Sequence, residues 1–151
     1  LSLLCELTYT AEINEESYDR AAELFELAYE RGDIIADLGT SPEIIRASIP
    51  EITGLRVLFY LDAHWEDYWP LLDELKVIAE LSAPPPVIVI HDFKVPDRPD
   101  LGFDSYGDQD LDYDYIRQSL TQIYGENGYD FHFNRVAIGA HRGVIFIEPK
   151  Y

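Results

Sequence analysis

Two apolar segments that each end on an aspartate constrain the fold of this chain more than any other feature. Residues 57–65 (Val-Leu-Phe-Tyr-Leu-Asp-Ala-His-Trp) and 87–92 (Val-Ile-Val-Ile-His-Asp) are rich in β-forming side chains. Short continuous apolar runs of this kind indicate parallel strands that are buried on both faces. Because residues 69–81 between them carry apolar side chains at helical spacing, the sequence predicts a strand–helix–strand unit.

The carboxyl ends of these two strands are where a ligand is expected. Open parallel sheets bind their ligands outside the carboxyl ends of the strands, and neighbouring strands lie about 4.8 Å apart. If the two strands are neighbours, Asp62 and Asp92 face the same crevice. Chemistry should therefore be sought at this edge of the sheet.

Composition narrows the class of protein. The 151 residues are 47% hydrophobic and 13% aromatic, which favours a single packed globular domain over residues 1–151. The formal net charge of −18 counts against nucleic acid or an anionic membrane as a partner, since both bind basic surfaces. No stretch approaches the roughly twenty apolar residues of a membrane span. A homo-oligomer is left open.

Two residue types bear on compartment and completeness. The single cysteine, Cys5, cannot form an internal disulfide; it is expected to be a small core residue, and it favours a reducing, cytoplasmic setting. No signal peptide is evident. The sequence contains no methionine and begins within an apolar pattern, so we expect that residues before Leu1 are missing from it.

The remaining elements follow from periodicity and from residues that stop helices. Residues 1–7 are expected to be the tail of a helix, and a helix over 15–31 would be capped by Ser17 and end at Gly32. The other predicted elements are strands 8–13 and 33–38, helices 41–49 and 112–124, and strands 130–138 and 144–148. Alternating helices and buried strands with a closing hairpin predict an α/β fold, mostly parallel, with one antiparallel strand.

Two of these strand ends are candidate cofactor contacts. Glu12 ends the first strand, where an acid can accept hydrogen bonds from both ribose hydroxyls of a nucleotide; the alternative is an ordinary solvated acid. Thr40 and Ser41 lie in a turn that opens a helix, so their hydroxyls and backbone N–H groups could bind a ligand. The alternative for this turn is plain helix capping.

Asp62 and Asp92 form the strongest candidate pair. Two carboxylates at neighbouring strand ends repel each other unless a cation or a shared proton lies between them. Magnesium bound by one or two carboxylates and water molecules is one solution. The alternative is that both acids cap helices or pair with Lys94 or Arg98.

Four histidines and three aromatic residues accompany the aspartates. His64 lies past the strand end and is a candidate base or ring-stacking residue. His91 directly precedes Asp92, so strand alternation should turn it to the opposite face as a structural residue. His132 and His141 are expected to be surface or core residues. Three aromatic residues could form a wall of the crevice, and the alternative is that they pack in the core: Trp65, Tyr68 and Trp69.

Together these motifs resemble those of the class I S-adenosylmethionine-dependent methyltransferases, and in particular the small-molecule O-methyltransferases of the catechol and macrocin type. Residues 61–65 (Leu-Asp-Ala-His-Trp) are similar to that branch's Leu-Asp-His-Trp segment with one residue inserted, and residues 89–92 to its strand that ends in a metal-ligand aspartate. Residues 10–14 resemble the strand whose acid holds the cofactor ribose, and residues 39–41 the turn at the adenine edge.

The resemblance implies a doubly wound Rossmann-like sheet and methyl transfer to an oxygen of a small-molecule acceptor. Asp62 and His64 would be the catalytic pair, and Asp62 and Asp92 would hold Mg²⁺. The implied contacts to S-adenosylmethionine are Glu12, Asn14, Thr40, Ser41, Asp62 and His64.

The chain also departs from that family. The family's first strand and glycine-rich loop have no counterpart and would lie before Leu1. Phe93 stands where catechol-type enzymes have an asparagine ligand, so an ion would depend on water and substrate oxygens. Glu66 or Asp67 stands near the place of the family's lysine base.

Two other functions remain open at this stage. A nicotinamide-dependent oxidoreductase would use the same strand-end acid for ribose, and a non-enzymatic α/β binding or scaffold protein could keep the fold without the glycine loop. Residues 93–112, rich in Asp, Gly and Pro, are the expected acceptor-binding segment; a disordered acidic loop is the alternative.

Overall fold

The computed structural model describes residues 5–64, 68–81, 84–137, 139 and 141–151, apart from the side chains of residues 27 and 29. The chain divides into two compact units, Leu1–Ser48 and Ile49–Tyr151. Each unit has its own hydrogen-bonded sheet. The single domain expected over residues 1–151 stays a prediction.

The first unit is built around two parallel strands. Strand β1 (Thr8–Glu12) pairs with β2 (Ile34–Leu38), with Thr8 opposite Ile34 and Glu12 opposite Leu38. Helices α1 (Glu15–Leu24) and α2 (Glu26–Glu30) connect the two strands. Both strands lie where the pattern of β-forming residues predicts them.

The long helix predicted over 15–31 is two helices, because the chain leaves helical geometry at Phe25 (φ −114°, ψ 19°). Its cap is Asn14, whose side-chain oxygen accepts the Ser17 N–H at 2.9 Å, so the assignment of Ser17 as the cap was wrong. Apolar spacing continues across the break, which is why periodicity alone did not reveal it. Residues 5–7 are not helical, contrary to the predicted helix tail, and residues 1–4 lie outside the described part.

Helix α3 (Ser41–Ile52) begins where predicted but continues past residue 49 through Pro50. A proline inside a helix removes one backbone hydrogen bond. The last turn is nevertheless closed by the Thr53 N–H, which donates to the Ile49 carbonyl at 3.0 Å. The helix therefore ends at Ile52, later than predicted.

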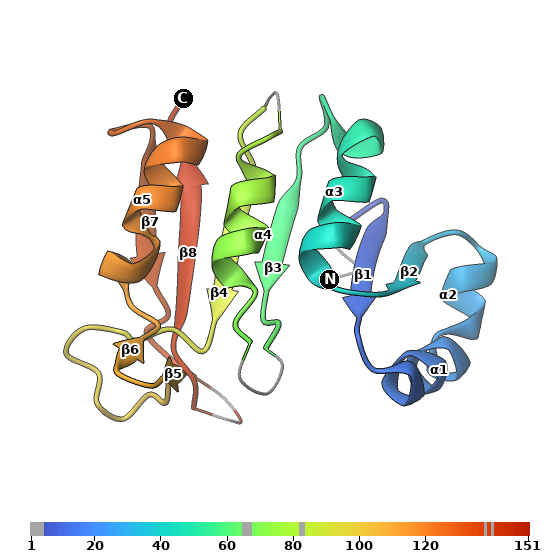
Figure 1. Ribbon diagram of the computed structural model, residues 1–151, viewed down its shortest axis with the longest axis horizontal. Coiled ribbons are helices and arrows are strands. Elements are labelled where there is room, and N and C mark those ends of the chain that lie inside the picture. Colours follow the sequence, from blue (N-terminus) through green and yellow to red (C-terminus); the bar gives the residue numbers. More distant parts are fainter. Residues whose placement is uncertain (1–4, 65–67, 82–83, 138, 140) are drawn as a thin grey trace. The chain divides into compact units, whose positions relative to one another are not determined.

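The second unit contains a four-stranded sheet in the order β3-β4-β8-β7. The strands are β3 (Leu58–Leu61), β4 (Val87–His91), β7 (Tyr129–Phe133) and β8 (Val144–Pro149). Strands β3 and β4 are parallel, as predicted, and they meet the condition of being neighbours; β8 is antiparallel to both β4 and β7. Only β8 runs against the other three, as the arrowheads in Figure 1 show, so the predicted Rossmann-like α/β class with one antiparallel strand is confirmed.

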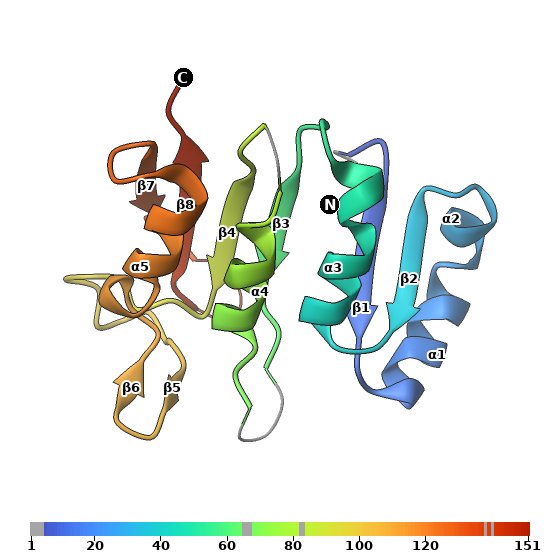
Figure 2. The same ribbon diagram turned by 45° about the horizontal axis from the view of Figure 1, so that its top comes forward.

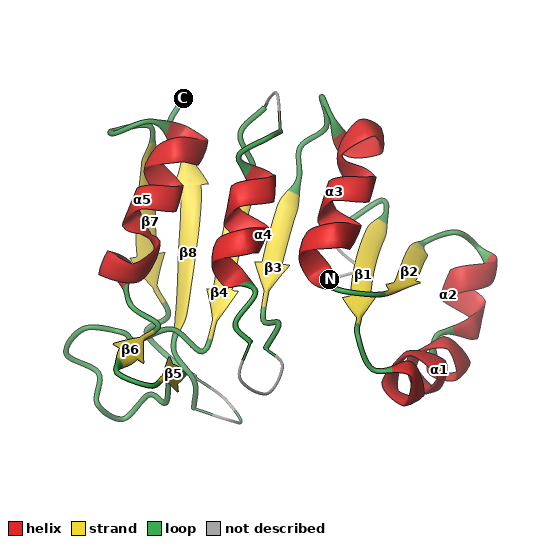
Figure 3. Ribbon diagram, in the orientation of Figure 1, coloured by secondary structure: helices red, strands yellow, loops and turns green. Residues whose placement is uncertain are grey.

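Helices α4 (Leu71–Ile78) and α5 (Tyr113–Tyr124) cover one face of this sheet (Figures 1 and 3). The side chains between the helices and the sheet are almost completely buried. They include Leu75, Ile88, Ile90, Ile116, Leu120, Ile145 and Ile147. Burial of this apolar face, at roughly 25 cal/mol per Å², is the main force that holds the unit together.

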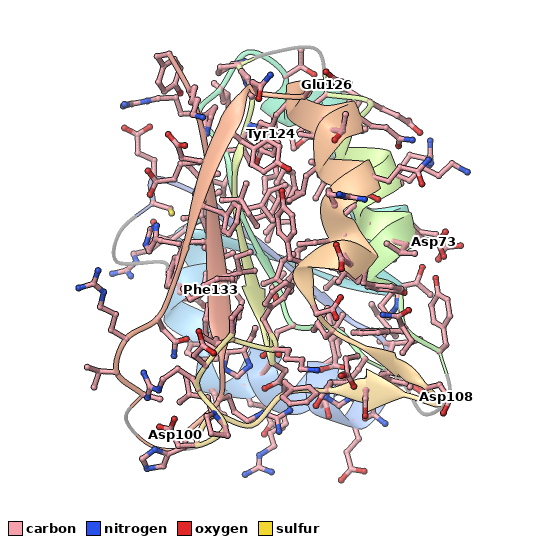
Figure 4. The ribbon with its side chains drawn as sticks, turned by 90° about the vertical axis from the view of Figure 1, so that its left-hand side faces the viewer. Asp73, Asp100, Asp108, Tyr124, Glu126 and Phe133 are labelled. Atoms are coloured by element: carbon pink, nitrogen blue, oxygen red, sulfur yellow. The ribbon has the colours of Figure 1, made fainter. Side chains whose placement is uncertain are left out.

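The segment that follows β4 is packed rather than solvated. Phe93, Val95, Leu101 and Leu111 are buried along it, so the alternative of a disordered acidic loop was wrong. The segment also forms a small hairpin of β5 (Ser105–Tyr106) and β6 (Gln109–Asp110), which projects below the sheet in Figure 2. In Figure 4, Asp108 lies at the tip of this hairpin.

Two further expectations concern single features. Cys5 is exposed, not a core residue, because it precedes β1 and lies outside the packed part of its unit. Among the described residues, no helix is both long and apolar enough to cross a membrane.

Candidate functional site

The site lies at the carboxyl ends of β3 and β4, where both strands end at the same edge of the sheet. The register pairs Leu61 with Ile90, so the next residues along the two strands, Asp62 and His91, are opposite each other. The side chain of Asp62 is 43% exposed, that of His91 26% and that of Asp92 13%. The acid of β3 therefore faces a histidine, and the acid of β4 follows one residue later.

His91 joins the two aspartates. Its Nδ1 lies 3.1 Å from Asp62 Oδ1 and 3.0 Å from Asp92 Oδ1. Because ionised carboxylates only accept hydrogen bonds, this nitrogen must carry the proton that is shared between them. The prediction that His91 points to the opposite face was wrong.

The backbone of Asp92 explains that error. Asp92 has φ +56°, a left-handed conformation that aspartate adopts more readily than most residues but still at some cost. Strand alternation no longer applies at such a residue, so its carboxylate turns back toward His91. A strained residue at a strand end is a common sign of a functional site.

Arg142, which the sequence analysis did not single out, completes the cluster. Its Nε donates to Asp92 Oδ1 and its Nη2 donates to Asp104 Oδ1. Arg142 lies in the connection before β8, the antiparallel neighbour of β4. Because the two strands are antiparallel, the start of β8 lies beside the carboxyl end of β4, and Arg142 is therefore close to Asp92. The strand topology could have identified Arg142, because residues just before an antiparallel neighbour of β4 must lie beside the carboxyl end of β4.

The alternative partners considered for the aspartates are engaged elsewhere. The Lys94 ammonium donates to Asp110 at 2.6 Å, and Arg98 donates to both oxygens of Asp100 at 2.7 and 2.8 Å. Neither contacts Asp62 or Asp92 in the described interactions. Asp92 is thus paired with a cation, but with one from fifty residues further along the chain.

The two aspartates have different acidities. Burial raises the pKa of Asp62; His91 lowers it and Asp92 raises it again, and the balance lies above the ordinary value. Burial also raises the pKa of Asp92, but the hydrogen bond from Arg142 and the charges of His91 and Arg142 outweigh it, so this pKa lies below the ordinary value. Asp62 is therefore the better proton acceptor of the two.

A cavity of about 10 Å³ lies beside these groups and is lined by Asp62, His64, His91, Asp92 and Glu74 among others. It has room for about one water molecule. His64 is exposed and near enough for its charge to lower the pKa of Asp62. The structure thus brings the predicted catalytic pair to one cavity.

The predicted aromatic wall is only partly available. The Trp69 ring stacks between Tyr106 and Tyr115, with centroid distances of 4.9 and 4.7 Å, so both of its faces are covered and it acts as packing. Tyr68 is 44% exposed and donates its hydroxyl to Asp73 at 2.7 Å. Trp65 lies outside the described residues.

Other predicted residues are less directly involved. His132 stacks on Phe146 at 4.9 Å and is exposed, so of the two expected places it lies at the surface. His141 is exposed and its carbonyl accepts the Gly102 N–H at 2.8 Å. Glu66 and Asp67, near the place of the family's lysine, lie outside the described residues.

Three side chains could offer ligand atoms to a metal ion. The candidate atoms of Asp62, His91 and Asp92 lie within 4.8 Å of one another, and His91 was not in the predicted set. The arrangement does not suit Mg²⁺ as it stands, because Asp92 Oδ1 already accepts from Arg142 and an imidazole is not a typical ligand of this hard cation. A magnesium site at Asp62 and Asp92 stays a prediction.

The first unit contains the predicted contacts to the cofactor. Glu12 Oε1 accepts the Asn14 N–H at 2.8 Å, and the Asn14 side chain caps α1. The Thr40 hydroxyl donates to Glu43 Oε2 at 2.6 Å, and Ser41 is the first residue of α3. Glu12 thus ends its strand with one carboxylate oxygen in use, and the Thr40 hydroxyl is engaged by the side chain of Glu43.

Comparison with known proteins identifies the fold. No family model matches the sequence, and no curated protein matches it. An O-methyltransferase from Bacillus cereus, solved in complex with SAH, is 18% identical with a TM-score of 0.62, and the match covers 95% of this chain and 63% of that chain. The present chain thus spans less than two thirds of that protein's length.

Two further solved structures are similar at lower scores. A putative rRNA methylase from Clostridium thermocellum is 11% identical with a TM-score of 0.51, covering 95% of this chain and 72% of that one. A precorrin 8W decarboxylase from Methanobacterium thermoautotrophicum is 11% identical with a TM-score of 0.51, covering 97% and 70%. The fold is that of the class I S-adenosylmethionine-dependent methyltransferases, as the sequence resemblance implied.

Proposed function

We propose that this protein transfers a methyl group from S-adenosylmethionine to an oxygen of a small molecule. The observation that carries the proposal is the fold, which resembles that of an SAH-bound O-methyltransferase over 95% of this chain. The acid, histidine and cavity at the ends of β3 and β4 lie where open α/β sheets bind their ligands. The oxygen target rests on the sequence motifs and on one solved structure of low identity.

The residues of the site fit the needs of such a transfer. When bound, S-adenosylmethionine would supply an electrophilic methyl group. The chain must then align the acceptor and remove a proton from its hydroxyl. Asp62, whose pKa is raised by burial, is the candidate base. His64 lines the same cavity and would pack beside the adenine or assist the deprotonation.

The cofactor contacts proposed in the first unit follow from strand-end chemistry. Glu12 retains a carboxylate oxygen beyond the one that accepts from Asn14, and a carboxylate at this place can accept from ribose hydroxyls. Thr40 and Ser41 precede and open α3, whose first N–H groups would face the adenine edge. Asn14 would act through its amide, since its oxygen caps α1.

The acceptor site is proposed in the segment between β4 and α5. This segment leaves the strand end beside Asp92, and its backbone is tied back there by the Asp104 N–H, which donates to the Asp92 carbonyl at 2.9 Å. Phe103 is 37% exposed and could contact an acceptor ring. The partner we propose is therefore a small molecule, and the cytoplasmic location stays a prediction.

Ligand-induced stabilisation tests the proposal against the nicotinamide and scaffold alternatives. A ligand that binds only the folded state stabilises it, by about 2.7 kcal/mol at a concentration of 100 times Kd. We expect S-adenosylhomocysteine to raise the melting temperature of the full-length protein and NAD to leave it unchanged. A shift with NAD alone would favour the oxidoreductase, and no shift with either ligand would favour the scaffold.

A further inference from the structure

The charges around Asp92 are balanced by residues of the chain itself. Asp62, Asp92 and Asp104 place three carboxylates near one strand end, and such groups repel each other unless a cation or a shared proton lies between them. In the structure, Arg142 donates to Asp92 and Asp104, and His91 Nδ1 lies between Asp62 and Asp92. Every carboxylate of the cluster therefore has a donor from the protein.

The backbone around Arg142 holds its side chain in this position. Asn134 Nδ2 donates to the Arg142 carbonyl at 3.0 Å, and Asn134 Oδ1 accepts the Val144 N–H at 2.8 Å. On the other side, Gly102 forms a parallel bridge with Arg142. A Cβ at residue 102 would lie 3.0 Å from Arg142 Nη1, so glycine there leaves room for the guanidinium.

A guanidinium and a divalent cation would compete for the same oxygen atoms. Arginine stays charged at any ordinary pH and presents a planar set of donors that matches carboxylates. Mg²⁺ needs oxygen ligands in near-ideal octahedral geometry, and in proteins one or two of them are usually carboxylates. Because Asp92 Oδ1 accepts from Arg142 and also faces His91, that oxygen is not available to an ion while Arg142 remains in place.

We propose that Arg142 takes the place of a divalent cation at this site, so that the strand-end aspartates bind no Mg²⁺ in the native protein. Arg142 is then a positioning residue, because it holds Asp92 and fixes Asp104 of the following segment against the strand end. The inference depends on the charges of the cluster, and metal binding can be measured whether or not the protein transfers methyl groups.

Calorimetric titration with Mn²⁺ and Mg²⁺ tests the proposal on the full-length protein without cofactor. Four proteins are compared: wild type, Asp92→Asn, Arg142→Gln and the double variant. The measured quantity is the Asp92-dependent binding, which is the saturable binding that disappears when Asp92→Asn is introduced. This difference excludes ions that are bound by the other surface acids. Asparagine tolerates the left-handed backbone of residue 92, so this variant should fold.

We expect no such binding in the wild type and a saturable Mn²⁺ site in Arg142→Gln, where Asp62, His91 and Asp92 become available. The matched control is Arg98→Gln. Arg98 also links the segment after β4 to the connection before β8, because it donates to the Arg135 carbonyl at 2.8 Å, but none of its interactions within the described part of the chain involves Asp92. This control should gain no site.

Two results would overturn the proposal. One is Asp92-dependent binding in the wild type, and the other is a folded Arg142→Gln variant, checked by circular dichroism, that gains none. If Arg142→Gln does not fold, the comparison of wild type with Asp92→Asn still decides, because Asp92-dependent binding there contradicts the proposal and its absence supports it. S-adenosylhomocysteine binding is measured separately, so failure of the proposed activity would remain distinguishable.

Discussion

At the scale of single residues, Asp92 combines a left-handed backbone with two charged partners. We predict that Asp92→Ala lowers the free energy of unfolding by about 1–3 kcal/mol, since it removes the acceptor of Arg142 and keeps a Cβ in an unfavourable conformation. Asp92→Asn should cost less, because asparagine tolerates φ above zero. Urea denaturation measures both, and equal losses in the two variants would argue against a backbone contribution.

Glu12 provides the second residue-scale prediction. If its carboxylate accepts from the cofactor ribose, Glu12→Ala should weaken S-adenosylhomocysteine binding by about 10–100-fold, the effect of losing hydrogen bonds to a charged group. Calorimetry measures the dissociation constant. The matched control is Glu23→Ala, an exposed acid of α1 in the same unit, which should bind normally. Unchanged binding by Glu12→Ala would contradict the ribose assignment.

At the scale of elements, Trp69 holds the β5–β6 hairpin to α5 through its stacks on Tyr106 and Tyr115. Each stacked pair is worth about 0.5–1.5 kcal/mol beyond its buried area. We predict that Trp69→Ala lowers unfolding free energy by about 1–3 kcal/mol and exposes residues 105–110 to limited proteolysis. Tyr68→Ala, the change at its exposed neighbour, is the control, and an equally protected hairpin in both variants would disprove the anchoring role.

The contact between α5 and β7 predicts a dependence on alkaline pH. The hydroxyls of Tyr113 and Tyr129 are hydrogen bonded at 2.7 Å, and burial together with this bond raises the pKa of Tyr129 to about 12. A tyrosine has a pKa of about 10 in the unfolded chain, and Tyr129 ionises at a higher pH in the folded protein. The difference stabilises the folded state below a pH of about 10. That contribution is lost as the pH rises toward 12.

Urea midpoints measured across this range should therefore fall in the wild type. The decline should be shallower in Tyr129→Phe, which cannot ionise at this position and keeps the aromatic packing. Some decline should remain in the variant, because burial also raises the pKa of Tyr124. Identical slopes in the two proteins would show that Tyr129 does not carry the effect.

At the scale of the whole molecule, the net charge of −18 sets the response to salt. Like charges repel in the folded state and are screened over about 10 Å at 0.1 M ionic strength. We predict that the melting temperature rises as NaCl is added to a low-salt buffer. A fall would mean that the local ion pairs, such as Lys94 with Asp110, outweigh the overall repulsion.

The sequence by itself determined most of the strands and whether they are parallel or antiparallel. The apolar runs before Asp62 and Asp92 predicted two parallel strands, and the closing hairpin predicted the antiparallel strand; both are confirmed. These features depend on local composition and on the burial of apolar faces, and both can be recognised from the spacing of apolar residues along the chain. The position of a site at the ends of β3 and β4 follows from the same spacing.

Tertiary structure alone decided how the site is composed. The alternation of side chains along a strand predicted that His91 points away from Asp92. The strand register and the backbone of Asp92 instead place His91 between the two aspartates. Arg142 reaches Asp92 only because β8 lies beside β4. Strand order, register and one unusual φ angle depend on the balance of contacts between distant segments, and no local pattern of residues reports that balance.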